Sequence, residues 1–190
     1  MCFALESYSE HKYITKMKHT RYSSLFALIA GLVFAVSAAA QGGSFSNADV
    51  EYSFELPDSK WKITVRPSAT TPNVEYVYVE RNDGHLEVRK LNVPDKTSVT
   101  DIIREEEQKL QFNKLGYVAG KEEAFSGFLD GTVFNFEFVR SGRPMVGRFY
   151  FLKAGENSIY VLRFTGYRDK LRSIRNQTDS IARTFTLKKR

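Results

Sequence analysis

The sequence contains very little cysteine and histidine. Among its 190 residues, Cys2 is the single cysteine, and His11, His19 and His85 are the three histidines. All of them except His85 precede residue 41, in a segment that we expect to be removed as an export leader. The rest of the chain then forms no disulfide, carries no thiolate nucleophile and supplies no cysteine–histidine zinc site. We therefore expect no metal and no cofactor.

The chain also lacks a long hydrophobic run. Its one strongly apolar stretch, residues 25–36, is 12 residues long, whereas a membrane-spanning helix needs roughly 20. A basic segment precedes it at 17–21 and alanines follow it at 38–40, which is the pattern of a signal peptide cleaved after Ala40. We predict a leader over residues 1–40, in which 1–16 is an over-long start and 17–40 is the signal peptide. The protein would be exported, either periplasmic or secreted, without a transmembrane anchor.

Acidic residues are scarce toward the C-terminus. Residues 49–139 contain more acids than bases, but residues 140–190 hold 13 lysines and arginines against only Glu156, Asp169 and Asp179. Such a basic end can face an anionic partner, whether an envelope protein, an acidic polymer or lipid head groups. The alternative is a solvated face that keeps the protein soluble.

Residues 41–48 are mostly small and polar, and we interpret them as a tether before a single domain over 49–190. In that domain, alternating patterns rich in aromatic and β-branched residues predict seven strands, at 52–56, 61–66, 74–81, 85–91, 132–140, 145–153 and 158–165. Turn residues separate neighbouring strands at 82–84, 141–142 and 154–157. These features predict an antiparallel meander.

Two segments have helical spacing instead. The first begins after Ser98, an N-cap with Asp101 at the third helical position, and it places glutamates 105–107 in solvent. Its apolar face consists of Ile102, Ile103 and Leu110. The second helix covers 167–183 and has a basic polar face, while its apolar stripe consists of Leu171, Ile174, Thr178 and Ile181. We expect both helices to pack on the sheet, although the second also fits an anionic membrane surface.

Both faces of the last strands are apolar. Phe134, Phe136 and Phe138 face one way, and Val133 and Val139 face the other. A sheet that is buried on both faces needs cover on both faces. The predicted fold class is therefore α+β, an antiparallel sheet with one helix on each face in an α/β/α sandwich. An arrangement with helices on one side only is the fallback.

The order of these elements resembles a known family. Phe-Glu-Leu-Pro at 54–57 is followed closely by Trp-Lys-Ile at 61–63, a helix, a meander and a closing helix that runs into Ser-Ile-Ala-Arg-Thr-Phe at 180–185. This layout resembles the PsbP-like superfamily, which includes the extrinsic protein of photosystem II and many small exported bacterial proteins. The resemblance covers residues 52–187 and implies an α/β/α sandwich with an accessory or binding role instead of catalysis. It supplies no catalytic residues, and nothing in the sequence points to a photosystem.

Motifs for catalysis are missing from the sequence. It contains no complete G-x-S-x-G serine motif, no phosphate loop and no dinucleotide fingerprint. We expect His85, a lone turn histidine, at the surface, and Glu137 in an ion pair with Arg148 or Arg163. We predict no nucleic-acid binding, because the aromatic residues alternate as core residues. Carboxylate pairs of the kind that hydrolyse glycosidic bonds stay open, since only the fold brings them together.

The predicted hairpin tip carries two arginines that can grip a carboxylate or a phosphate. With basic residues of the second helix they form the predicted partner-binding set: Arg140, Arg143, Arg168, Arg172 and Arg175. The main hypothesis is an exported, non-catalytic accessory or binding protein of the cell envelope. The alternatives are an envelope-polymer hydrolase that uses carboxylates only, and a protein that associates with anionic membrane through its last helix.

Overall fold

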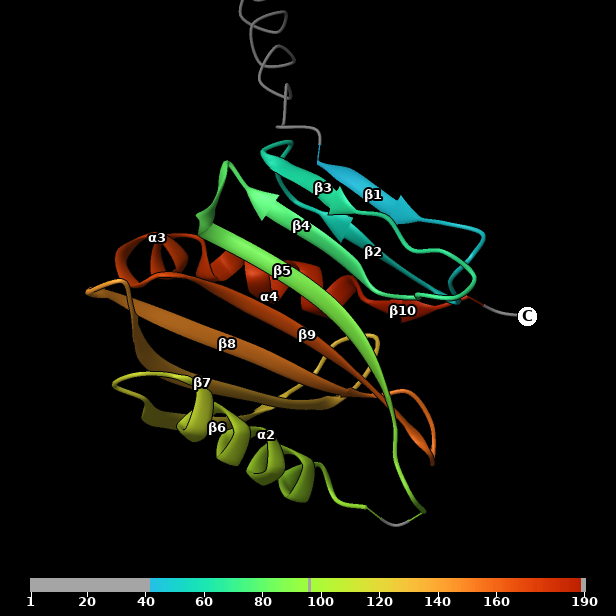
Figure 1. The fold of residues 1–190 in the computed structure, drawn as a ribbon. Helices are drawn as coiled ribbons and strands as arrows, with labels where there is room; N and C mark the ends of the chain where they lie inside the picture. The colour runs from blue at the N-terminus through green and yellow to red at the C-terminus, as the bar shows by residue number, and fades with distance from the viewer. Residues whose placement is uncertain (1–41, 96, 189–190) are drawn as a thin grey trace, which may run out of the picture. The chain divides into compact units, whose positions relative to one another are not determined.

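A seven-stranded antiparallel sheet forms the centre of the fold in the computed structural model, which describes residues 42–95 and 97–188. The predicted leader lies outside the described residues. The strand order is β3-β4-β5-β9-β8-β7-β6 (Figure 1). Strand β5 therefore pairs with β9, although one helix and three strands lie between them in the sequence. The strands are β3 Trp61–Val65, β4 Val74–Tyr78, β5 Glu80–Asn92, β6 Val118–Phe125, β7 Gly131–Arg140, β8 Arg143–Lys153 and β9 Ser158–Tyr167. Six of these strands were predicted and β6 was not, while the seventh predicted strand, 52–56, lies in a smaller sheet.

A smaller sheet joins the two ends of the described chain. Its strands, in spatial order, are β1 Gly43–Ser46, β2 Tyr52–Leu56 and β10 Thr186–Leu187. The interpretation of residues 41–48 as a tether is therefore wrong for β1, which pairs antiparallel with β2. The cause is one aromatic anchor: Phe45 is 5% exposed and its ring stacks on that of Phe54, with centroids 4.9 Å apart. A mostly polar segment becomes a strand because this ring is buried.

Helix α2 (Val99–Asn113) covers one face of the large sheet. Ser98 caps its N-terminus as predicted, because the hydroxyl accepts a hydrogen bond from the Asp101 N–H at 3.1 Å. The predicted apolar face is confirmed by the burial of Ile102, Ile103 and Leu110.

The predicted second helix is two helices, α3 (Arg168–Ser173) and α4 (Arg175–Thr184). They are separated at Ile174, whose φ of −108° and ψ of 19° lie outside the α-helical region. The break accompanies close packing of Ile174 on β5, where a Cβ atom at Gly84 would lie 3.0 Å from the Ile174 Cδ1. The predicted apolar stripe is nevertheless confirmed, since its four residues are all buried: Leu171, Ile174, Thr178 and Ile181.

The turn between β4 and β5 differs from the prediction. It lies at Val79, with φ 59°, and β5 runs without interruption through 82–84. Gly84 serves packing instead of a turn, because it admits the side chain of Ile174. The turn at Ser141 and Gly142 is confirmed, with φ values of 51° and 73°.

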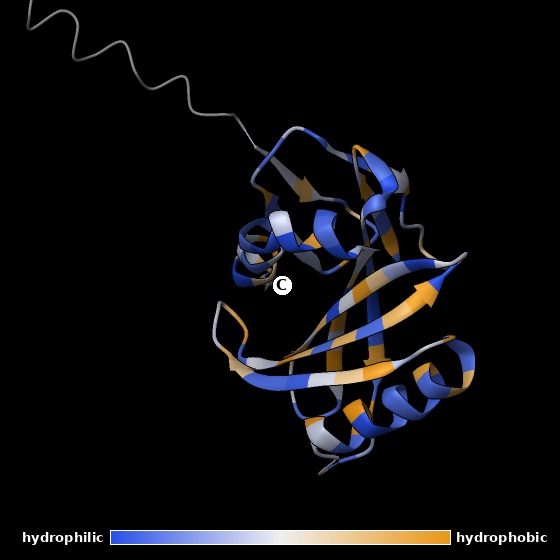
Figure 2. Ribbon diagram, turned by 90° about the vertical axis from the view of Figure 1, so that its left-hand side faces the viewer, coloured by the Kyte–Doolittle hydropathy of each residue, from blue (hydrophilic) through white to orange (hydrophobic). Residues whose placement is uncertain are grey.

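Alternate residues of the central strands fill two cores, one on each face of the large sheet. Phe136 and Phe149 pack with α2, whereas Tyr150 and Leu162 pack with α3, α4 and the small sheet. Figure 2 shows stretches of hydrophobic residues in the strands between the helices. The predicted α/β/α sandwich is confirmed, and the small sheet adds to the core on the α3–α4 face.

Truncation of Phe45 tests whether β1 belongs to the core. We expect Phe45→Ala to lower the free energy of unfolding by about 3–5 kcal/mol, because it leaves a cavity beside Phe54. Urea unfolding measures the change. Ser44→Ala, at an exposed position of the same strand, is the control and should shift stability by less than about 0.5 kcal/mol. Equal stability of Phe45→Ala and wild type would contradict a packed β1.

Candidate functional site

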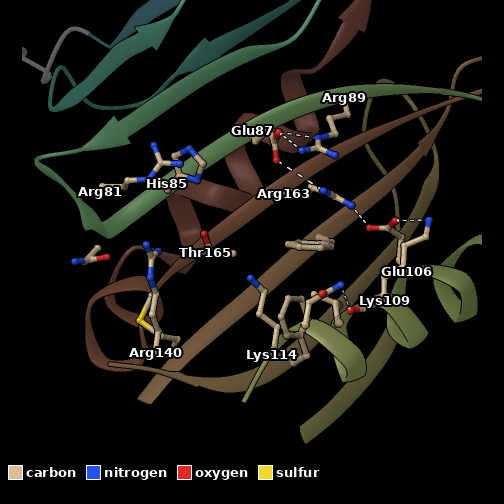
Figure 3. Close-up of a pocket in the computed structure, with 16 residues that line it drawn as sticks. Arg81, His85, Glu87, Arg89, Glu106, Lys109, Lys114, Arg140, Arg163 and Thr165 are labelled. Carbon is tan, nitrogen blue, oxygen red and sulfur yellow. Dashed lines mark hydrogen bonds and ion pairs between the residues drawn. The ribbon is translucent and has the colours of Figure 1, made fainter. Parts of the chain in front are cut away.

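A groove lies between α2 and strand β5, on the α2 face of the large sheet. Its volume is about 460 Å³, and side chains of α2, β5, β7, β8 and β9 line it. Phe136, Met145 and Phe149 form apolar parts of the wall, and each is almost fully buried. Six other lining residues are cationic: Arg81, Arg89, Lys109, Lys114, Arg140 and Arg163 (Figure 3). We call this hollow the cationic groove.

The two carboxylates that line the cationic groove are both engaged by its own cations. Glu106 of α2 forms an ion pair with Arg163, and its Oε1 lies 3.1 Å from the Lys109 Nζ. Glu87 of β5 lies 2.6 Å from the Arg89 Nη2 and 3.8 Å from the Arg163 Nη1. The groove therefore keeps an excess of positive charge.

The prediction that glutamates 105–107 lie in solvent is wrong for Glu106. Its exposed fraction is 6%. It points toward the sheet because Arg163, which stands among apolar residues of β9, offers it a buried cation. An ion pair with good geometry offsets the cost of desolvating both groups.

Arg163, which is mostly but not fully buried, is the cation at the centre of these pairs. It faces Glu87 across the β5–β9 register, and 18% of its side chain is exposed. Its Nε atom is buried without a hydrogen-bond partner in the described part of the chain. Burial, and next the charge of Arg89, lower the pKa of the Arg163 guanidinium below its ordinary value. The Nε–H of Arg163 therefore keeps an unmet hydrogen-bonding capacity inside the site, although its charge is shared with Glu87 and Glu106.

Two further cations of the groove have no acidic partner among the residues that the structure describes. Within residues 42–95 and 97–188, no carboxylate lies at ion-pair distance from Arg140 or Lys114. Lys114 approaches the ring of Phe138, with Nζ 5.3 Å from the centroid. Figure 3 shows both cationic side chains directed into the hollow. These groups are available to a ligand.

His85 is not at the surface, which corrects the expectation for it. It is 9% exposed on β5, and its Nε2 lies 2.8 Å from the Oε2 of Glu75, which Arg81 also approaches at 3.3 Å. Burial alone would raise the pKa of the Glu75 carboxyl, but hydrogen bonds and charge from His85 and Arg81 lower it. The histidine is buried because residues 82–84 continue the strand instead of forming a turn.

The predicted partner-binding set does not form one surface. Arg140 lines the groove, and Arg143, at the same hairpin tip, lies over the ring of Tyr167 with its guanidinium carbon 3.7 Å from the centroid. Arg175 lies elsewhere, on α4, at 3.5 Å from a carboxylate oxygen of Glu123.

The other two arginines of the set, Arg168 and Arg172, both form ion pairs with Glu137. Arg168 and Arg172 approach its carboxylate oxygens at 2.8 Å and 2.7 Å. The expected pairing of Glu137 with Arg148 or Arg163 is therefore wrong. The physical reason is that Glu137 faces away from α2, on the side where α3 supplies its own arginines.

Among the groove residues, the predicted partner-binding set contains only Arg140. For the groove residues of β5, the sequence does contain a usable pattern: His85, Glu87 and Arg89 alternate with the buried Leu86 and Val88. This alternation indicates a strand with one charged face. It does not reveal which strand and which helix meet that face.

The described residues include no group of three or more histidine, cysteine, aspartate or glutamate side chains that could hold a metal ion. No helix in this part of the chain has the length and apolar character needed to cross a membrane.

Comparison with known proteins identifies the fold. No protein-family model and no curated protein matches the sequence. Among solved structures, cyanobacterial PsbP (CyanoP) from Synechocystis sp. PCC 6803 is similar, with 14% sequence identity, a TM-score of 0.57, and coverage of 80% of this chain and 95% of that chain.

Two further structures have the same likeness. LpqN, involved in cell envelope biogenesis of Mycobacterium tuberculosis, has 12% identity, a TM-score of 0.51, and coverage of 78% of this chain and 91% of that chain. PA94 from Pseudomonas aeruginosa, a protein of unknown function, has 12% identity, a TM-score of 0.50, and coverage of 79% and 99%. The chain has the PsbP-like fold, as the resemblance in its sequence predicted. Identities of this size show the fold alone.

Removal of Glu106 tests the buried pair. We expect Glu106→Ala to lower the free energy of unfolding by about 3 kcal/mol, because the Arg163 charge loses its main partner. The double variant Glu106→Leu/Arg163→Met should recover most of this loss, since it leaves no unpaired buried charge. Urea unfolding measures both. Glu105→Ala, exposed on the same helix, is the control; a loss as large as that of Glu106→Ala would contradict a specific pair.

Proposed function

We propose that this chain is an exported, non-catalytic binding protein of the cell envelope that holds an anionic group in the cationic groove. The charge balance of the groove carries this proposal, because its six lining cations outnumber the three carboxylates that pair with them, Glu75, Glu87 and Glu106. The described residues offer no acidic partner to Arg140 or Lys114, and Arg163 keeps one buried nitrogen without a hydrogen-bond partner among them. Guanidinium and ammonium groups that converge on one hollow bind carboxylate, phosphate or sulfate oxygens.

Export and an envelope role rest on two separate supports. The sequence pattern at 17–40 is that of a signal peptide. The fold likeness includes LpqN, which is described as involved in cell envelope biogenesis. An anionic group of an envelope polymer, lipid or protein is therefore the ligand class that we propose.

A hydrolase that uses carboxylates alone is the alternative function. In the cationic groove it would have to use Glu87 and Glu106, and both are held by ion pairs with the protein's own cations. Catalysis needs a carboxyl directed at the substrate. The observed pairing favours binding over hydrolysis.

Direct titration tests the proposed binding. At low salt we expect the protein to bind polygalacturonate, a polycarboxylate, or polyphosphate, and not neutral dextran. Lys114→Ala/Arg140→Ala should weaken this binding by about tenfold or more, because hydrogen bonds to charged groups are worth about 1.5–3 kcal/mol each. Isothermal titration calorimetry measures the affinity, and circular dichroism confirms that the variant is folded.

The matched control is Arg172→Ala/Arg175→Ala, which removes two cations from the α3–α4 face. It should retain affinity within about twofold, beyond the general effect of net charge. Absence of binding to both polymers, or an equal loss in both double variants, would contradict the proposal. New reducing ends in polygalacturonate that Glu106→Gln abolishes would support the hydrolase instead.

A further inference from the structure

Three large apolar side chains stand in water where α2 ends and β6 begins. Phe112 is 95% exposed, Leu115 is 80% exposed and Val118 is 60% exposed. We call residues 112–118 the α2 corner. A concentration of exposed apolar side chains in one short segment indicates a surface that contacts an apolar partner.

The backbone of the α2 corner is held in place. The Leu115 carbonyl accepts a hydrogen bond from the Val139 N–H of β7 at 2.8 Å, and the Lys114 N–H donates to the Leu110 carbonyl at 2.8 Å. Gly116 has φ 60°, and a Cβ atom there would lie 3.0 Å from the Val139 side chain. The chain turns tightly against β7, so an ordered backbone presents the apolar side chains to solvent.

Cations accompany these apolar side chains. Lys109 and Lys114 flank Phe112 along the chain, and the hydrogen bond to β7 places the α2 corner next to Arg140 at the end of that strand. The nearby carboxylate of Glu107 accepts a hydrogen bond from the Tyr117 hydroxyl at 3.1 Å. Exposed Phe and Leu beside Lys and Arg are typical of surfaces that enter the interface of an anionic bilayer.

The last helix, which the sequence offered as a membrane contact, has no such surface. Thr178 and Ile181, in its apolar stripe, are 0% exposed. The protein interior already occupies the face that would have to meet lipid.

We propose that the α2 corner docks on the surface of an anionic lipid bilayer. Phe112 and Leu115 enter the boundary between head groups and acyl chains, while Lys114 and Arg140 contact lipid phosphates. Asn113 and Lys114 belong to the α2 corner and also line the cationic groove. Docking in this way brings the groove to the membrane surface.

Flotation with lipid vesicles tests the proposal on protein purified from cells that express the full chain. Wild type should float with vesicles of mixed phosphatidylcholine and phosphatidylglycerol at low salt, and less with phosphatidylcholine alone. Phe112→Ser/Leu115→Ser should lower the vesicle-bound fraction about tenfold, because two apolar side chains no longer leave water. Phe128→Ser is the matched control, since Phe128 is also exposed, at 71%, but lies outside the α2 corner.

A fluorescence measurement reports on the α2 corner itself, whatever else holds the chain on a vesicle. In Phe112→Trp, emission should shift to shorter wavelength on addition of anionic vesicles, whereas the native Trp61, 4% exposed, gives a constant background. Three results would each overturn the proposal. They are absence of binding to anionic vesicles at low salt, equal binding by Phe112→Ser/Leu115→Ser and wild type, and unchanged Phe112→Trp emission in the vesicle-bound protein.

Discussion

Burial of both faces of β7, β8 and β9 determines how the remaining elements are arranged. Successive residues of these strands enter different cores, as Phe149 does beneath α2 and Tyr150 beneath α4. Strands of this kind have no polar face to place in water, so layers are needed on both sides. The small sheet extends one of these layers. As a result, Phe45 and Phe185, which come from opposite ends of the described residues, share one core.

Because both faces of the sheet are covered, polar side chains on them need partners inside the protein. Arg148 reaches beneath α4 and is satisfied there by Asp179 at 2.7 Å and Asn135 at 2.6 Å. Arg163 on the other face depends on Glu106 of α2 and keeps one buried nitrogen without a partner in the described chain. A single helix does not cover the full width of a seven-stranded sheet. The cationic groove lies where the cover by α2 ends, and the charged face of β5 forms one of its walls.

Elements with a strong local pattern could be predicted from the sequence, such as the Ser98 cap and strands β7 to β9. Strand β6 (Val118–Phe125) could not, because it is an edge strand with only one buried residue and a register shift, so hydrophobic alternation is missing. β1 depends on Phe45 alone. For the groove, Glu106 and Arg163 are 57 positions apart. They meet only after β5 pairs with β9 and α2 folds onto the sheet, and no local pattern encodes that meeting.

The position of strand β2 in the small sheet has a consequence for the order in which its two pairings form during folding. The strand lies between β1 and β10, whose sequence positions are at opposite ends of the described chain. Contacts of such large sequence separation form late, because the entropy of closing a long loop must first be overcome. During the proposed export, β2 would acquire its second partner only when Leu187 has emerged from the membrane. A chain stalled in translocation would leave one edge of β2 unpaired, and an unpaired edge is what chaperones and proteases of the receiving compartment can recognise.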